Sequence, residues 1–248
     1  MLPDVVQYLL FIGMAALMFL LRMDTRRFSA AEWDTQDGEW RVWMGRLSWY
    51  AAGLALALII FALHPAPVAE LNLVLGSNRG EALTYGLLFG GAGIAAAFVL
   101  ALLRNGRISF PSPIRYPGGV LTAVGTAFYD EWLFRGVMLG LLLQLGLPDW
   151  LAIVSAAFIY AFTVRAGTGS RGIFTLALWL AIGLVAGALT VSTLGIAAAF
   201  LGHAITRFAL FMTMGPPERV AVQEVHRPTG GTGDDGAYVI GPRDMRRG

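Results

Sequence analysis

The sequence contains no cysteine and no lysine, and only 14% of its 248 residues are charged. The absence of cysteine excludes disulfide bonds, thiolate metal ligands and a cysteine nucleophile. Soluble domains usually carry about 25% charged residues, so the low charge also excludes an ordinary soluble protein. All 18 basic residues are arginines scattered among apolar segments, without the basic patch that nucleic-acid recognition needs. We therefore expect no nucleic-acid partner.

Long apolar segments dominate the sequence, and 56% of the residues are hydrophobic. A membrane-spanning helix needs about 20 such residues, with a range of roughly 17–25. Seven segments meet this requirement: residues 5–22, 47–63, 83–103, 119–146, 149–165, 172–191 and 194–213. The sequence therefore predicts an all-α, polytopic transmembrane helical bundle of about seven spans, whose main partner is membrane lipid.

The arginines predict the orientation of these spans. With the N-terminus outside and the C-terminus inside, 15 arginines lie on the cytoplasmic side and one, Arg79, lies outside, as the positive-inside rule requires. The N-terminal stretch has no basic residue before its apolar run, which indicates an uncleaved reverse signal-anchor. We expect a multi-pass protein of the inner (plasma) membrane with a cytoplasmic C-terminus.

Composition divides the chain into three predicted parts. Residues 1–83 hold the first transmembrane helices and a cytoplasmic loop, where Trp33, Trp40 and Trp43 favour the membrane interface. Residues 84–213 form a transmembrane core. Residues 214–248 are polar and rich in glycine, and are expected to be a disordered cytoplasmic tail.

Five ionisable residues fall inside predicted spans, where burying a charge costs roughly 2.5–3.5 kcal/mol on insertion scales. They are Asp130, Glu131, Arg135, His203 and Arg207. On a helix, Glu131 and Arg135 share a face, as do His203 and Arg207. A rise of 1.5 Å per residue places Glu131 about 18 Å and His203 about 15 Å from the cytoplasmic ends of their spans. Arg207, about 9 Å from that end, can reach the acids or the interface.

Four roles suit this predicted cluster. Two acids and a histidine can perform general acid–base catalysis. Two acids and two arginines also balance as a buried ion cluster that fixes helix packing. Carboxylates and imidazole can bind a divalent metal, but the nearby arginines oppose a cation, so we expect no metal and no cofactor. An acid pair can also relay protons in a transporter, although no inverted repeat stands out in the sequence.

The stretch DEWLFRG at residues 130–136 resembles the EExxxR motif of the CAAX prenyl endopeptidase and bacteriocin-processing family, also called the Abi family. Members of that family are polytopic, mostly bacterial membrane proteins, and the active ones are metal-independent glutamic intramembrane proteases. Its second motif, FxxxH, corresponds by position to FIYAF at residues 158–162. Its third motif, HxxxN or HxxxD, corresponds to HAITR at residues 203–207. The resemblance covers roughly residues 84–213.

The resemblance implies a role for each predicted site residue. The first acid, Asp130, and the histidine of the second motif activate the attacking water. Glu131 and Arg135 support them. His203 and the residue at position 207 stabilise the oxyanion of the tetrahedral intermediate, as preorganised donors do.

This chain departs from the family pattern at three positions. Asp130 replaces the first glutamate and shortens the acid by about 1.5 Å. Phe162 replaces the histidine and removes a proton acceptor, and nearby Tyr160 is no base at neutral pH. Arg207 replaces a neutral amide or an acid, and it can either serve an oxyanion or pair with Asp130.

Two functions follow from the motif and its departures. The motif predicts a metal-independent intramembrane endopeptidase that hydrolyses a membrane-associated peptide or protein. The departures favour the alternative, a catalytically silent relative that acts as a membrane scaffold, chaperone or immunity-type binding protein.

Overall fold

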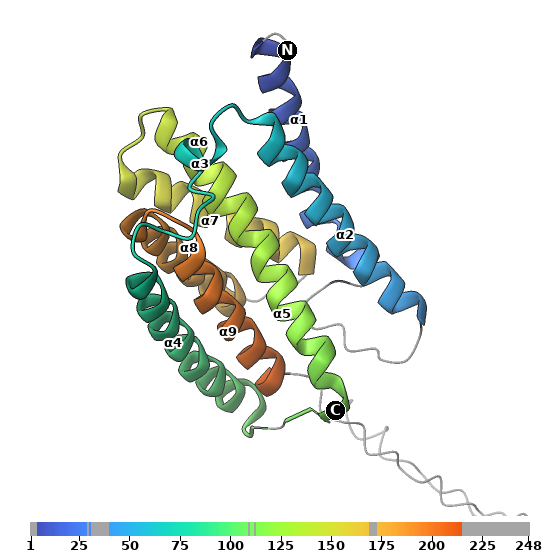
Figure 1. The fold of residues 1–248 in the computed structure, drawn as a ribbon. Helices are drawn as coiled ribbons and strands as arrows, with labels where there is room; N and C mark the ends of the chain where they lie inside the picture. Colours follow the sequence, from blue (N-terminus) through green and yellow to red (C-terminus); the bar gives the residue numbers. More distant parts are fainter. Residues whose placement is uncertain are drawn as a thin grey trace, which may run out of the picture. The chain divides into compact units, whose positions relative to one another are not determined.

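A computed structural model describes residues 4–28, 30, 40–108, 110–111, 113–168 and 173–214 (Figure 1). These residues are mostly helical, with short turns and loops between the helices, and they contain no strand. The longer α-helices are α1 (Asp4–Met23), α2 (Trp40–Leu63), α4 (Arg79–Asn105), α5 (Tyr116–Asp130), α7 (Asp149–Thr168), α8 (Ile173–Thr193) and α9 (Ala197–Met214). The shorter elements are η1 (Thr25–Phe28), α3 (Pro67–Glu70), η2 (Pro113–Arg115), η3 (Glu131–Met138) and α6 (Leu139–Gln144).

The seven predicted segments correspond to α1, α2, α4, the run α5–η3–α6, α7, α8 and α9, which confirms the all-helical architecture. Five of these helices, α1, α2, α4, α7 and α8, are long and apolar enough to cross a membrane, and α9 is apolar but shorter. The chain is therefore a multi-pass membrane protein. Its orientation stays a prediction, and both Trp33 of the predicted loop and the tail after Met214 lie outside the described residues.

The fourth predicted span is not one continuous α-helix. The α-helical pattern stops at Asp130, and η3 is a π-helix, with hydrogen bonds between residues five positions apart. A π-turn holds more residues than an α-turn and so rotates the side chains that follow it. Glu131, Phe134 and Arg135 are all buried within it, at no more than 1% exposure. The acid pair therefore stands where the helical register changes.

Local signals explain where two of the helices begin. Asn78 precedes α4, and its side-chain oxygen accepts hydrogen bonds from the backbone N–H groups of Gly80 and Glu81 at 3.0 and 3.3 Å. This is the usual way an asparagine satisfies the first donors of a helix. The helix α5 carries Pro117 in its first turn, where a missing N–H leaves no hydrogen bond unmade.

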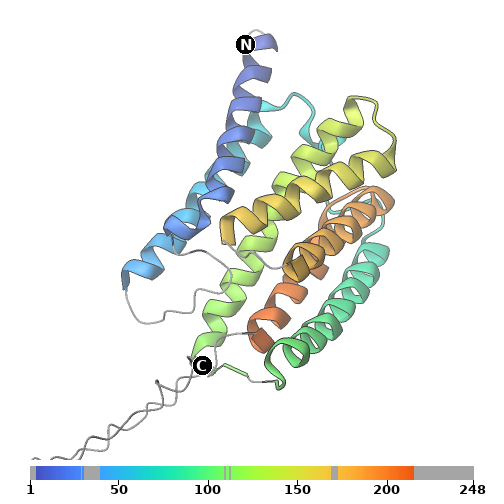
Figure 2. The ribbon, with the colours of Figure 1, turned by 180° about the vertical axis from the view of Figure 1, so that it is seen from behind.

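The helices pack around α9 and α5, which carry most of the predicted site. Seen from the front, α4, α9, α5 and α2 follow one another in a row (Figure 1), and α9 packs along both α4 and α5. From behind, α1, α7 and α8 cover the other side (Figure 2). The helix α7 packs along α8, and α1 contacts α2 and α7. Asp130 at the end of α5 is therefore surrounded by helices.

The end of α1 lies inside the bundle rather than at its edge. The indole N–H of Trp49 donates to the carbonyl oxygen of Leu21 at 2.9 Å. Trp49 is nine residues into α2, which is about 14 Å along the axis at 1.5 Å per residue. Arg22, which the orientation argument places with the cytoplasmic arginines, is completely buried in the structure, and its side of the membrane stays a prediction.

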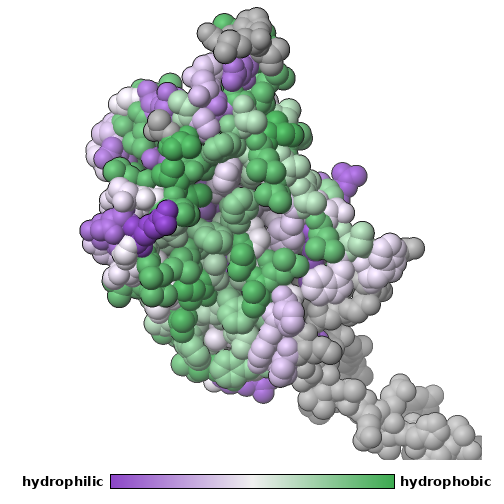
Figure 3. Space-filling model, in the orientation of Figure 1, coloured by the Kyte–Doolittle hydropathy of each residue, from purple (hydrophilic) through white to green (hydrophobic). Residues whose placement is uncertain are grey.

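Apolar side chains cover much of the face shown in Figure 3. On α4, for example, Leu83, Leu87 and Leu88 are all exposed. A water-soluble protein rarely exposes a continuous apolar area of this kind. The surface therefore fits contact with lipid chains, in agreement with the spans.

Glycines allow α4 to approach α9 closely. Three glycines of α4 face α9: Gly86, Gly90 and Gly93. A Cβ atom added at Gly93 would lie 2.6 Å from Cβ of Thr206. Thr206 is β-branched and its hydroxyl donates to the carbonyl oxygen of Gly202 at 2.8 Å, so it has little freedom to move aside. Small residues at such contacts are the usual basis of helix association in membranes.

We expect Gly93→Ala to lower the free energy of unfolding by about 1–3 kcal/mol, because the extra methyl group forces α4 and α9 apart. Gly91→Ala is the matched control: it lies in the same helix, and a Cβ there meets nothing within 4 Å. The control should be neutral or slightly stabilising, since alanine favours a helix over glycine. Thermal unfolding in detergent measures both variants, and equal midpoints would contradict the packing described.

Candidate functional site

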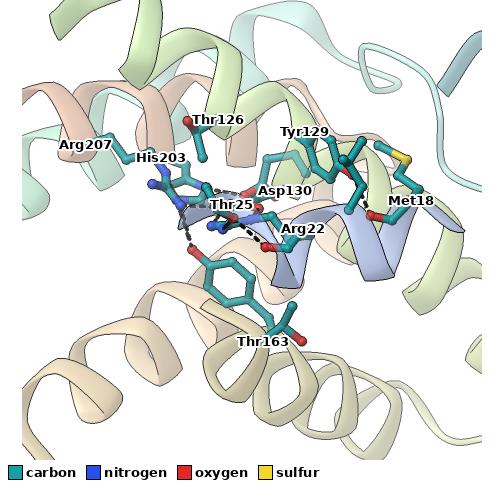
Figure 4. A network of polar contacts seen from close by, with 12 residues as sticks. Met18, Arg22, Thr25, Thr126, Tyr129, Asp130, Thr163, His203 and Arg207 are labelled. Atoms are coloured by element: carbon teal, nitrogen blue, oxygen red, sulfur yellow. Dashed lines mark hydrogen bonds and ion pairs between the residues drawn. The ribbon is translucent and has the colours of Figure 1, made fainter. Parts of the chain in front are cut away.

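The five predicted site residues meet in one buried cluster. Asp130 and Glu131 lie at the junction of α5 and η3, Arg135 lies in η3, and His203 and Arg207 lie on α9. None of the five is more than 5% exposed. Figure 4 shows Asp130 between side chains that come from α1 and from α9. The cluster predicted from span depth therefore exists.

Asp130 is bound by two arginines from two different helices (Figure 4). Arg22 of α1 donates from Nε to Oδ1 at 2.5 Å and from Nη2 to Oδ2 at 3.2 Å. Arg207 of α9 also donates, from Nη2 to Oδ2. Arg22 is positioned in turn by Thr25, whose hydroxyl accepts from Nη1 at 3.0 Å. Both oxygens of Asp130 therefore accept charge-assisted hydrogen bonds.

Glu131 pairs with His203 and with Arg135. Its Oε1 atom lies 2.5 Å from Nδ1 of His203, and Nε of Arg135 lies 3.3 Å from Oε2. The predicted pairing of positions 131 and 135 is thus confirmed. The guanidinium carbon of Arg135 lies 4.3 Å from the ring centroid of Tyr160, in a cation–π contact. Within the described residues, Oε2 of Glu131 and both Nη atoms of Arg135 are buried without a hydrogen-bond partner.

The hydrogen bonds determine the tautomer of His203. Arginine can only donate, and Nε of Arg207 lies 2.8 Å from Nε2 of the histidine. Nε2 is therefore the acceptor, and the proton lies on Nδ1, where it is donated to Glu131. The hydroxyl of Tyr160 also lies 3.1 Å from Nε2. Both ring nitrogens of a neutral His203 are already engaged.

The residue of α7 that reaches the cluster is Tyr160 and not Phe162. Tyr160 is completely buried, whereas Phe158 and Phe162 are 46% and 53% exposed and stack on each other with ring centroids 6.5 Å apart. The side chain at position 162, which the motif alignment gives to the family's histidine, therefore faces away from the acids. A tyrosine stands on the inner face instead.

Arg22 is the site residue that sequence reasoning missed. It ends an apolar span, which is where arginines ordinarily reach the interface, so position alone gave no signal of burial. Its inclusion changes the charge of the cluster. The described residues of the cluster bring together three guanidinium groups, from Arg22, Arg135 and Arg207, and two carboxylates.

These contacts restrict what the cluster can do chemically. A general base must present a lone pair to the proton that it takes, yet both oxygens of Asp130 are bound by guanidinium groups. The side chain that α7 contributes is a phenol, which is no base at neutral pH. Among the described residues, no group of three His, Asp or Glu side chains is placed to hold a metal ion.

A small cleft lies beside Arg207. Gly119 and Thr122 of α5, Trp179 of α8, and Arg207 and Leu210 of α9 are among its lining residues. Its volume is about 20 Å³, which is room for roughly one water molecule. Asp130, Glu131 and His203 do not line it. The cleft therefore reaches the edge of the cluster but not its acids.

Comparison with known proteins supports the resemblance inferred from the motifs. The family model for type II CAAX prenyl endopeptidase Rce1-like proteins matches residues 111–209. This range contains all five predicted site residues, whereas Arg22 lies outside it. The resemblance to CAAX prenyl endopeptidases is thereby confirmed. Searches of curated proteins and of solved structures found no match.

We expect Asp130→Asn to lower the free energy of unfolding by roughly 3–5 kcal/mol, because it leaves two buried guanidinium groups without their carboxylate. Asp24→Asn is the matched control, since Asp24 pairs with Arg27 at 3.7 Å on the exposed surface. Such a pair contributes about 0–1 kcal/mol. Denaturant unfolding in detergent compares the two, and a small effect of Asp130→Asn would contradict the ion cluster.

Proposed function

We propose, on the premise that residues 111–209 form an Rce1-like domain in a multi-pass membrane protein, that this chain is a catalytically silent relative of the CAAX prenyl endopeptidases. It uses the domain as a membrane-embedded scaffold or binding protein. The observation that carries the proposal is the double ion pair of Asp130 with Arg22 and Arg207. In the resemblance, Asp130 is the acid that activates water.

The ion pairs make Asp130 a poor proton acceptor. Two guanidinium groups stabilise its ionised form, and a stabilised carboxylate has little tendency to take a proton from water. The histidine that would assist it has no counterpart in the cluster, because Tyr160 occupies the inner face of α7. Water activation therefore lacks both of its implied participants.

The two residues that the resemblance assigns to the oxyanion are also bound within the cluster. His203 and Arg207 are the residues that the resemblance assigns to oxyanion stabilisation. Here Arg207 donates to His203 and to Asp130, and His203 contacts Glu131. Donors that already serve one another are not aimed at a substrate carbonyl, which is the condition for stabilising a tetrahedral intermediate.

The same contacts give the cluster a structural role. They join α1, the α5–η3 junction and α9, and the ring of Tyr160 adds α7. In this proposal, residues 1–83 are the N-terminal helical part that supplies Arg22, and residues 84–213 are the core. The predicted placement in the inner (plasma) membrane, with the C-terminus in the cytoplasm, belongs to the same proposal.

Peptide hydrolysis is the second candidate function, and one observation favours it. Oε2 of Glu131 is buried without a hydrogen-bond partner among the described residues, and Oε1 contacts His203. A water molecule that entered beside Oε2 would meet a carboxylate with a free lone pair. Glu131 would then act as the base, on a membrane-associated peptide.

The deciding experiment is endoproteolysis by the purified protein in detergent, with a fluorogenic prenylated CAAX peptide as substrate. We expect no cleavage above that of the Glu131→Ala variant, because Asp130, the acid that the resemblance assigns to water activation, is held by two arginines. An active CAAX prenyl endopeptidase in the same detergent serves as the positive control. Cleavage that resists chelators and is lost in both Glu131→Ala and His203→Ala would instead establish the second candidate.

A further inference from the structure

The cleft beside Arg207 gathers hydrogen-bond donors from three helices at one depth. Thr122 is six residues from the start of α5, Trp179 is six residues from the start of α8, and Arg207 is seven residues from the end of α9. At 1.5 Å per residue, each lies about 9–10 Å along its helix from that end. All three line the same cleft.

The walls of the cleft are positive and rich in donors. Arg207 contributes a guanidinium group, whose carbon lies 4.9 Å from the ring centroid of Trp179. The indole N–H of Trp179 is buried without a hydrogen-bond partner among the described residues. An indole nitrogen can only donate, so an acceptor oxygen in the cleft would satisfy it. Among the described residues, no carboxylate lines the cleft.

The ion cluster next to the cleft also carries more positive than negative groups. Its described residues bring together three guanidinium groups and two carboxylates. Little water is present at this depth to screen the difference, so the potential at Arg207 favours an anion. The volume of about 20 Å³ holds about one water-sized atom, so one oxygen of an anionic group can enter the cleft and the rest of the group stays outside it.

We propose that this cleft binds the anionic headgroup of a membrane lipid, an inference that rests on the proposed binding role of the silent domain. The helices α5, α8 and α9 line the cleft and belong to a bundle with exposed apolar side chains, such as Val120 and Val124 of α5 at 47% and 43% exposure, as expected of a protein surrounded by lipid. Basic pockets between transmembrane helices are established sites for anionic headgroups.

The test is lipid-dependent stabilisation of the full chain. The purified protein in detergent is titrated with phosphatidylglycerol, with oleate and with phosphatidylcholine, while its thermal unfolding midpoint is followed. A ligand that binds the folded state raises the midpoint with its concentration. We expect phosphatidylglycerol, oleate or both to raise it and phosphatidylcholine to leave it unchanged. The first two ligands distinguish a phosphate headgroup from a carboxylate headgroup.

Trp179→Phe tests the cleft without removing charge. It keeps the ring beneath Arg207 and removes only the N–H, so we expect binding to weaken about tenfold, as for one hydrogen bond to a charged group. Trp132→Phe is the matched control, because it also removes a buried indole N–H without a partner, but outside the cleft. It should leave the lipid effect intact. Arg207→Gln should abolish the effect if the variant folds.

Three results would overturn the assignment. One is equal stabilisation by phosphatidylcholine. Another is an undiminished lipid effect in Trp179→Phe. The third is stabilisation by a peptide with a free C-terminal carboxylate while neither anionic lipid has an effect, which would assign the cleft to a peptide. Peptide cleavage in the earlier assay would refute the silent role separately, because it is measured without added lipid.

Discussion

The carboxylate of Asp130, bound between Arg22 and Arg207, is the interaction on which the rest of the structure depends. It joins α1, α5 and α9 at a point where Asp130 is completely buried. In a membrane, apolar contact does little to bring helices together, so close packing and polar links decide their arrangement. Glycine provides the close packing between α4 and α9. The Asp130 ion pairs provide a charged link to α1, in which many apolar side chains are exposed.

The interaction that stabilises the buried charge of Asp130 also opposes a catalytic role for it. A buried acid needs a positive partner to remain charged, whereas a water-activating acid needs a lone pair that is free. Asp130 meets the first condition, but guanidinium groups bind both of its oxygens and make them weak proton acceptors. Glu131 is less constrained: among the described residues only Oε1 accepts a hydrogen bond, and Oε2 has an ion pair with a single arginine, Arg135. The family motif contains two acids. Arginines bind Asp130, the one that the resemblance assigns to water activation.

The sequence predicted the elements and most of the cluster, because both follow from strong signals. Apolar length marks a span, and a charge inside a span must face other charges, which brought Asp130, Glu131 and His203 together. Two features had no such signal. The π-helix η3 depends on packing around Glu131–Met138 rather than on local composition. The burial of Arg22 in the cluster was unpredictable, because the charges of the five predicted residues already balanced. Nothing in the sequence indicated that the cluster contains another arginine.

Arg207 connects the proposed loss of hydrolysis with the proposed binding of an anion. Its Nη2 atom donates to Asp130 and its Nε atom donates to His203. Both of these acceptors are residues that hydrolysis would use. Its guanidinium group also lines the cleft with Trp179. A neutral amide at this position would leave Asp130 with one arginine and the cleft without its cation. The side chain that binds Asp130 is thus also the one that gives the neighbouring cleft its positive charge. For that reason, silence toward peptides and affinity for an anionic headgroup are expected together in this chain.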